Sequence, residues 1–189
     1  MRRMYMSKKK IGILVGSLRK ESFNKKIAEA MAKLFPAEYE VSFLDISDLP
    51  LYNEDLDVSD VPATWTRFRE DAGTKDAFLF VTPEYNRSVP AVLKNALDVG
   101  SRPYGASIWD KKVGAVVSAS PGALAGFGAN HHLRQSLVFL NVLTMQQPEA
   151  YLGNVGEFIA EDGSITNEGT LGFMQVIVDS FVDLIEKNA

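Results

Sequence analysis

The sequence predicts an α/β fold in which one parallel sheet is covered by helices on both faces. Short apolar runs alternate along the chain with longer segments whose apolar residues recur at helical spacing. The apolar runs are nearly continuous, which is typical of strands buried on both sides, and helix-length connections are what parallel strands require. With 189 residues and 46% hydrophobic content, the chain has the size and apolar content of one domain with a substantial core.

The chain is expected to begin with a tail and then to enter the sheet. Residues 1–9 are rich in Lys and Arg, and we expect a disordered basic tail there, followed by a single domain over residues 10–189. The apolar run behind the tail is too short for the hydrophobic part of a secretion signal. This run, residues 11–15, predicts the first strand, and residues 25–35 predict an amphipathic helix after it.

The remaining elements continue the alternation. Further strands are expected over residues 41–46, 77–82, 113–118 and 143–146. Further helices are expected over residues 63–72, 90–99, 130–142 and 171–187. Between the last strand and the last helix, residues 153–169 form a polar excursion, with the turn residues of a small hairpin at Asp162 and Gly163. Five strand-helix units in one domain predict a flavodoxin-like three-layer sandwich with the strand order 2-1-3-4-5.

Composition excludes several classes of chemistry. The chain has no Cys, so disulfides, thiolate nucleophiles, iron–sulfur clusters and Cys-ligated zinc are ruled out. A net charge of −4 without a long basic block gives no support to nucleic-acid binding. The only two histidines, His131 and His132, are neighbours that do not share a helix face, so no metal site is expected. We expect a soluble, cytoplasmic protein that does not insert into membranes.

In this fold class, ligands bind beyond the carboxyl ends of the strands. The turn after the first strand is rich in side chains that can donate hydrogen bonds to an anion. This phosphate turn (residues 16–24) carries Ser17, Arg19, Ser22 and Asn24 at the expected start of a helix. It matches neither the P-loop nor the dinucleotide-binding glycine pattern. Either it binds a phosphate monoester, or Ser22 and Asn24 only cap the helix while Arg19 is a solvated surface charge.

Two further loops should lie at the same end of the sheet. The aromatic loop (residues 82–90) is bounded by prolines and carries Tyr85 among polar groups. The glycine-rich loop (residues 118–128) would let a planar ligand or a second backbone approach closely. A flavin ring needs an aromatic or apolar wall with backbone groups near its polar edge. The alternative is that both loops are ordinary turns and that Tyr85 packs locally.

These segments carry a resemblance to a known family. The phosphate turn, the aromatic loop and residues 93–96 behind it resemble the NADPH-dependent FMN reductases, most closely their bacterial chromate reductase and quinone reductase branch. The likeness extends to residues 132–135 and 147–149. It implies that FMN is the bound cofactor, with its phosphate in the phosphate turn and its ring between the other two loops. The cofactor-binding residues that it implies are Ser17, Leu18, Arg19, Ser22, Phe23, Asn24, Pro83, Glu84, Tyr85, Asn86, Arg87 and Ser120.

The resemblance also implies an activity and an assembly. NAD(P)H would give hydride to the flavin, which would then reduce a quinone by two electrons in a ping-pong reaction, with adventitious activity on chromate, ferric complexes or azo dyes. Because the flavin carries the chemistry, no catalytic residue is assigned, although Glu84 and Arg87 are candidates for contact with the substrate. Glu84 could equally anchor its loop. Family members of this branch are homodimers or homotetramers.

Alternatives remain open from the residues alone. The chain could be an electron carrier of the flavodoxin type, or a reductase that supplies free reduced FMN to a monooxygenase. Arg19 and the modest acidity argue against the carrier. The apolar residues Leu137, Val138, Leu140 and Val142 exceed what a two-faced helix needs, so this helix either packs in the core or contacts another subunit.

Overall fold

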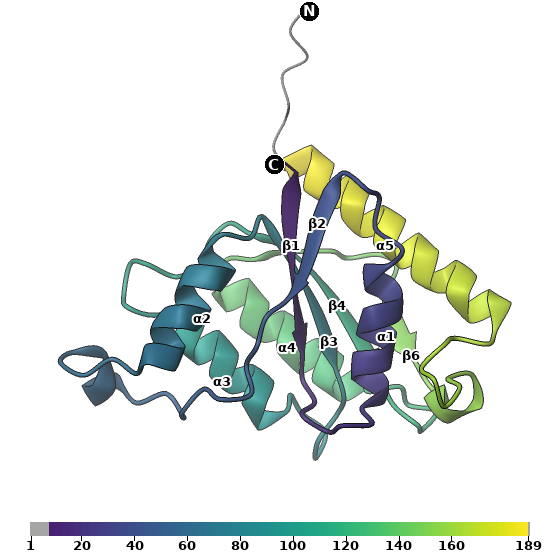
Figure 1. The fold of residues 1–189 in the computed structure, drawn as a ribbon, viewed down its shortest axis with the longest axis horizontal. Helices are drawn as coiled ribbons and strands as arrows, with labels where there is room; N and C mark the ends of the chain where they lie inside the picture. Colours follow the sequence, from purple (N-terminus) through teal and green to yellow (C-terminus); the bar gives the residue numbers. More distant parts are fainter. Residues whose placement is uncertain (1–7, 189) are drawn as a thin grey trace, which may run out of the picture.

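A computed structural model describes residues 8–188 as a twisted parallel sheet between two layers of helices (Figure 1). The strands are β1 (Lys9–Val15), β2 (Tyr39–Phe43), β3 (Ala77–Thr82), β4 (Val113–Ala119), β5 (Leu143–Thr144) and β6 (Ala150–Leu152). The helices are α1 (Phe23–Ala32), α2 (Ala63–Gly73), α3 (Ala91–Gly100), α4 (Phe127–Phe139) and α5 (Glu168–Asn188), with short 3₁₀ turns η1 (Glu54–Asp57) and η2 (Val155–Glu157). The strand order β2-β1-β3-β4-β5 confirms the predicted fold class.

Alternate side chains of each central strand enter two separate cores. On one face, Ile13 of β1, Leu79 of β3 and their neighbours pack against α1 and α5. On the other face, Leu14, Phe80 and the two buried tryptophans pack among α2, α3 and α4. Because both faces are covered, β3 and β4 are buried along their whole length, which explains their uninterrupted apolar sequences.

The structure adds one strand that the sequence pattern does not predict. The fifth strand is short, and the chain then returns as β6, which pairs in parallel with the end of β4 through Val117 and Ala150. The three residues of β6 are too few to show the alternation of apolar and polar residues that indicates a strand. Only their pairing with β4 in the folded protein reveals β6. The predicted helix over residues 130–142 lies about one turn too late along the chain, because α4 begins at Phe127. Gly126 is the N-cap of this helix and has a positive φ of 71°.

The two ends of the described chain lie close together, away from the carboxyl ends of the strands (Figure 1). Lys9 at the start of β1 forms an ion pair with Glu186 of α5 at 3.1 Å. The tail predicted over residues 1–9 falls outside the described residues except for its last two positions, Lys8 and Lys9. Within residues 8–188, no helix combines the length and the apolar character needed to cross a membrane.

The carboxyl ends of β1, β3 and β4 lie next to one another. Val15 of β1 is in register with Val81 of β3, which is in register with Val117 of β4. The phosphate turn, the aromatic loop and the glycine-rich loop therefore leave the sheet side by side. This adjacency brings together residues that are about a hundred positions apart in the sequence.

Candidate functional site

The phosphate turn joins β1 to α1 and leaves its backbone donors available. Ser22 is the N-cap of α1, and its Oγ accepts a hydrogen bond from Lys25 N at 3.3 Å. Between residues 17 and 24, no backbone N–H donates to an acceptor in the described part of the chain. Free N–H groups at the positive end of a helix bind anions. Ser22 can cap the helix and still donate its own hydrogen to a ligand, because a hydroxyl does both.

Asn24 is a buried polar residue whose hydrogen bonding is incomplete. Its Nδ2 donates to the carbonyl oxygen of Ala119 at 3.2 Å, which ties α1 to the end of β4. Its Oδ1 is buried and has no hydrogen-bond partner. A buried acceptor without a partner costs about 1–3 kcal/mol. A ligand that carries hydroxyl groups would satisfy this oxygen.

The three loops enclose one cleft of about 270 Å³ at the carboxyl ends of the strands. The residues that line it are Ser17, Arg19, Ser22, Phe23, Asn24, Pro83, Glu84, Tyr85, Ala119, Ser120 and Pro121. Most of the predicted cofactor-binding residues therefore lie in one place, although the sequence separates them widely. Leu18 instead lines an adjoining, mostly apolar hollow of about 430 Å³ that shares Arg19 and Tyr85 with the cleft.

The aromatic loop contains a tight hairpin. Tyr85 and Ser88 exchange backbone hydrogen bonds of 3.1 and 3.0 Å. Between them, Asn86 and Arg87 have positive φ values of 50° and 65°, as in the two-residue hairpins whose twist suits adjoining strands. Asn86 and Arg87 thus form the tip of the hairpin and do not line the cleft. Tyr85 is half exposed beside the cleft.

Glu84 attaches this hairpin to α4. One carboxylate oxygen accepts a hydrogen bond from Ala129 N in the first turn of α4 at 3.0 Å. The other lies 3.2 Å from Nη1 of Arg87. A carboxylate at the N-terminus of a helix is stabilised by the free N–H groups and the helix dipole. Gly128 permits this contact, because a Cβ there would stand only 2.9 Å from Oε2 of Glu84.

The glycine-rich loop is anchored by buried polar contacts. Asn130 of α4 is fully buried, and its Oδ1 accepts from Nε of Arg134 at 2.8 Å. Arg134 in turn donates to the carbonyl oxygen of Met145 at 2.7 Å. Ser120, at the edge of the cleft, accepts from Gly122 N through its Oγ at 3.1 Å. Nδ2 of Asn130 also donates to Oγ of Ser118 at 3.3 Å, which ties α4 to the end of β4.

The two histidines make separate contacts. Nδ1 of His132 lies 3.0 Å from Oγ of Ser88 in the hairpin. Nε2 of His131 lies 2.9 Å from the hydroxyl of Tyr151. Burial and a hydrogen bond with Glu149 raise the pKa of Tyr151 to about 12, so the phenol stays neutral at physiological pH. Among residues 8–188, no group of three or more His, Asp or Glu side chains is arranged to hold a metal ion.

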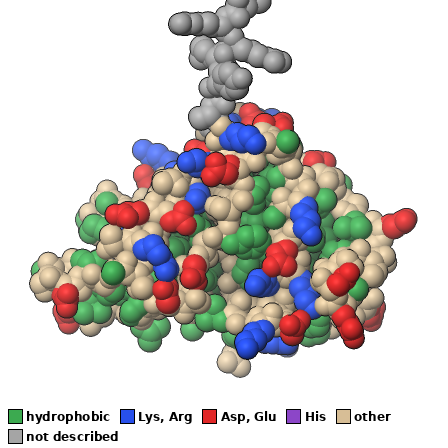
Figure 2. All heavy atoms as spheres, in the orientation of Figure 1, with side chains coloured by type: hydrophobic (Ala, Val, Ile, Leu, Met, Phe, Trp, Pro, Cys, Tyr) green, Lys and Arg blue, Asp and Glu red, His purple; other side chains and the backbone are tan. Residues whose placement is uncertain are grey.

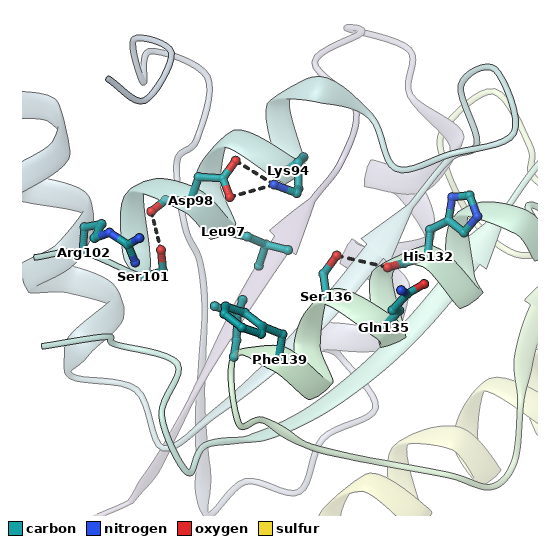
Figure 3. Close-up of a pocket in the computed structure, with 10 residues that line it drawn as sticks. Lys94, Leu97, Asp98, Ser101, Arg102, His132, Gln135, Ser136 and Phe139 are labelled. Carbon is teal, nitrogen blue, oxygen red and sulfur yellow. Dashed lines mark hydrogen bonds and ion pairs between the residues drawn. The ribbon is translucent and has the colours of Figure 1, made fainter. Parts of the chain in front are cut away.

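A larger hollow lies elsewhere, between α3 and α4 (Figure 3). It measures about 630 Å³ and is lined by Lys94, Asp98 and Arg102 from the α3 side and by His132 and Phe139 from α4. Its size exceeds that of the strand-end cleft, but its lysine and aspartate are already paired at 2.7 Å. The smaller cleft, where unpaired donors converge, therefore fits a phosphate-bearing ligand better than this hollow does.

Comparison with known proteins agrees with this geometry. The family profile of the NADPH-dependent FMN reductases matches residues 9–157. A quinone reductase of Pseudomonas putida is 54% identical over 178 residues, which cover 94% of this chain and 95% of the relative. The chain belongs to the NADPH-dependent FMN reductase family. It is accordingly an oxidoreductase, with FMN as cofactor and NAD(P)H as electron donor.

Other relatives of this FMN reductase are similar over most of their length. A 2-hydroxy-1,4-benzoquinone reductase of a Burkholderia species is 44% identical, with 91% of this chain and 93% of the relative covered. The structure of the flavoenzyme NAD(P)H:(acceptor) oxidoreductase FerB of Paracoccus denitrificans superposes with a TM-score of 0.89 at 43% identity, over 95% of this chain and 98% of FerB.

The residues present in the FMN reductase fit the cofactor. The phosphate turn offers free N–H groups and an unpaired Arg19 to a phosphate, and Oδ1 of Asn24 can accept from a ribityl hydroxyl. The sequence did not predict that Ala119 and Pro121 line the cleft. It also did not predict the contact between Glu84 and α4. Small apolar residues give no chemical pattern, and that contact depends on two loops that only the fold brings together.

Proposed function

We propose that this FMN reductase uses bound FMN to pass two electrons from NAD(P)H to quinones. The supporting observation is the single cleft in which donors from the phosphate turn meet the aromatic and glycine-rich loops. Relatives named as quinone reductases at 54% and 44% identity favour a quinone as the electron acceptor. We also propose that chromate, ferric complexes and azo dyes are adventitious electron acceptors. Residues 10–189 form a single FMN-binding domain in this proposal, and the protein is located in the cytoplasm.

The phosphate turn holds the cofactor in this proposal. Ser17, Arg19 and Ser22 donate hydrogen bonds to its phosphate, together with the free backbone N–H groups. Hydrogen bonds to a charged group contribute about 1.5–3 kcal/mol each, whereas the helix dipole alone gives about 0.3–1 kcal/mol. Asn24 accepts from the ribityl chain. The remaining members of the predicted set, Leu18 and Phe23, give apolar contact on either side of the turn.

The other two loops position the ring. Pro83 and Tyr85 form one wall and Ser120 forms the opposite one, while Asn86 and Arg87 form the tip of the hairpin that carries Tyr85. When bound, FMN accepts hydride from NAD(P)H and supplies both electrons to the acceptor. Glu84 acts by holding the hairpin against α4, and Arg87 by its ion pair with Glu84. We assign no protein residue as acid or base.

An anaerobic titration of the purified protein tests the proposal. The protein should be yellow or take up FMN, lose its flavin absorption when NADPH is added, and regain it when a quinone is added. A colourless protein that takes up no FMN would overturn the proposal. A bound flavin that NADPH reduces only slowly, with a stable one-electron state, would favour an electron carrier instead.

We also propose a homodimer or homotetramer in which subunits meet at the groove between α3 and α4. Phe139 is 87% exposed there, and Val138 is 72% exposed, whereas Leu137 of the same helix is fully buried. Apolar side chains this exposed beside a large groove are typical of an association surface. Because one face carries both a projecting ring and a groove, two copies can pack by twofold symmetry.

A further inference from the structure

A second hollow lies on the other side of the phosphate turn from the cleft. It measures about 320 Å³ and is bounded by the turn, the start of α1 and the end of β2. Ser17 and Arg19 line both spaces, so the two adjoin. Lys20 and Lys25 line only the second. We call this space the basic hollow.

Positive charge in the basic hollow is not balanced by ion pairs. In the described part of the chain, no carboxylate lies within ion-pair distance of Arg19, Lys20 or Lys25. The neighbouring Lys26, by contrast, is paired with Glu21 at 3.1 Å. Figure 2 shows Lys and Arg side chains, with acidic side chains among them, at the lower end of the molecule, where Figure 1 places the turn after β1.

The position of Lys25 strengthens this argument. Lys25 belongs to the first turn of α1, which contains no acidic residue. A cation at the positive end of a helix is unfavourable, whereas an acidic residue there would be favourable. A helix that places a lysine at this end, beside two further cations, is stabilised when an anion binds. Ser22 and Asn24, from the same turn of helix, line the FMN cleft instead, so Lys25 serves a different space.

Asp45 is the one carboxylate among the residues that line the basic hollow. Its Oδ1 accepts from Ser47 N at 2.9 Å and from Ser47 Oγ at 2.7 Å. Its Oδ2 lies 4.0 Å from Nη1 of Arg67, a guanidinium that is itself paired with Asp48 at 2.7 Å. Asp45 is therefore engaged with its own neighbours, and three cations against one carboxylate leave the hollow positive.

The basic hollow also has an aromatic wall. Phe43, at the end of β2, is 43% exposed and lines the hollow with Leu44 and Ile46. Nucleobases stack on exposed aromatic rings. An exposed ring beside unpaired lysines therefore fits a phosphorylated nucleoside better than a free inorganic anion.

We propose that the basic hollow binds the 2′-phosphorylated adenosine of NADPH, with Lys20 and Lys25 contacting the phosphate and Phe43 contacting the adenine. The inference rests on the proposed function, because it assigns the electron donor of that reaction. NADPH differs from NADH only in this phosphate, which carries about −1.5 to −2 charge at neutral pH. The enzyme consequently prefers NADPH over NADH.

The first experiment compares the two donors kinetically in the FMN-loaded enzyme with a quinone as acceptor. The double variant Lys20→Gln/Lys25→Gln should lower the ratio of kcat/KM for NADPH to kcat/KM for NADH by about tenfold or more, as expected for lost charge-assisted hydrogen bonds. Lys33→Gln is the matched control, because Lys33 is an exposed lysine at the other end of α1. Its ratio should equal that of the wild type.

The second experiment measures binding without turnover. Calorimetric titration of the FMN-loaded protein with 2′,5′-ADP, 5′-AMP and inorganic phosphate should give the tightest binding for 2′,5′-ADP. The double variant should bind 2′,5′-ADP about tenfold more weakly, and Lys33→Gln should bind it as the wild type does. Phe43→Ala should weaken the binding of 2′,5′-ADP and leave the binding of inorganic phosphate unchanged.

Several outcomes would overturn the inference. An unchanged donor ratio in the double variant, or equal affinity for 2′,5′-ADP and 5′-AMP, would exclude a 2′-phosphate site. Phosphate that binds as tightly as 2′,5′-ADP would indicate a simple anion site. These failures differ from a failure of the proposed function, in which the wild type would reduce quinone with neither donor.

Discussion

At the residue scale, Arg19 has a special place because it borders the cleft, the basic hollow and the apolar hollow. Its guanidinium is permanently charged and presents several donors in a fixed plane, which suits phosphate oxygens. It also has no ion-pair partner in the described part of the chain. The same residue can therefore contact the FMN phosphate and contribute to the potential that attracts NADPH.

Replacing Arg19 with Ala should weaken FMN binding by about 1.5–3 kcal/mol, because a hydrogen-bonded charge is lost. The fold should be intact, since the side chain is exposed. Quenching of FMN fluorescence during titration of the apoprotein measures the affinity, and circular dichroism checks the fold. An FMN affinity equal to that of the wild type would remove Arg19 from the phosphate site.

Glu84 acts at the same scale through the position of its loop. Glu84→Ala should lower kcat more than it weakens FMN binding, because the phosphate turn remains while the hairpin loses its link to Ala129. Loss of a helix cap should also reduce the free energy of unfolding by about 0.5–2 kcal/mol. Steady-state kinetics, FMN titration and urea unfolding measure the three quantities. Glu84→Gln should restore part of the stability. A pure loss of FMN affinity would contradict the positioning role.

At the scale of elements, the hairpin and α4 form one unit. Glu84 reaches Ala129 N, Ser88 reaches His132, and the backbone of Arg87 passes close to Gly128. Arg87 adopts a left-handed conformation that costs a side-chain-bearing residue about 1–3 kcal/mol. These contacts offset that cost and keep the hairpin beside the cleft.

Gly128→Ala tests this unit. A Cβ at Gly128 would stand 2.9 Å from Oε2 of Glu84 and 3.0 Å from the carbonyl oxygen of Arg87. Overpacking of this kind should destabilise the protein by about 1–3 kcal/mol and displace the hairpin, with a loss of kcat. Gly172→Ala in α5 is the control, because a Cβ there meets nothing within 4 Å and should stabilise by about 0.5–1 kcal/mol. If both variants behaved alike in urea unfolding, the close contact would have no energetic importance.

At the scale of the whole molecule, the two ends of α4 have different surroundings. Its N-terminal turn holds the hairpin of the cleft. Its C-terminal turn presents Phe139 beside the groove with α3 (Figure 3) and exposes Val138. His132 lines that groove and also contacts Ser88 of the hairpin. Association at the groove would therefore bring a second subunit close to the active site.

Phe139→Asp should convert a dimer to monomers, or a tetramer to dimers, because a charge replaces an apolar side chain at the centre of the proposed interface. Sedimentation velocity measures the mass. Val176→Asp is the control, since Val176 of α5 is also half exposed but lies on the opposite layer. A wild type that sediments as a monomer, or a Val176→Asp variant that dissociates equally, would contradict the proposed interface.

The sequence by itself determined the strand order and the identity of the chemical groups at the strand ends. Apolar runs such as residues 77–82 are continuous because both of their faces are buried, and this local pattern survives in the sequence. The donors of the phosphate turn are equally local, since Ser17 through Asn24 lie in one turn. The predicted strand order is confirmed, and the roles of those donors remain predictions.

Only the tertiary structure decided the strand β6, the attachment of Glu84 to α4 and the separation of the cleft from the basic hollow. Each depends on residues that are distant in sequence, such as Glu84 with Ala129, or Lys20 with Phe43. Hydrogen bonds and enclosed spaces between such residues arise when the parallel sheet aligns its strand ends. Local propensity contains no information about that alignment. The sequence therefore identifies the functional side chains, and only the fold shows which residues they contact.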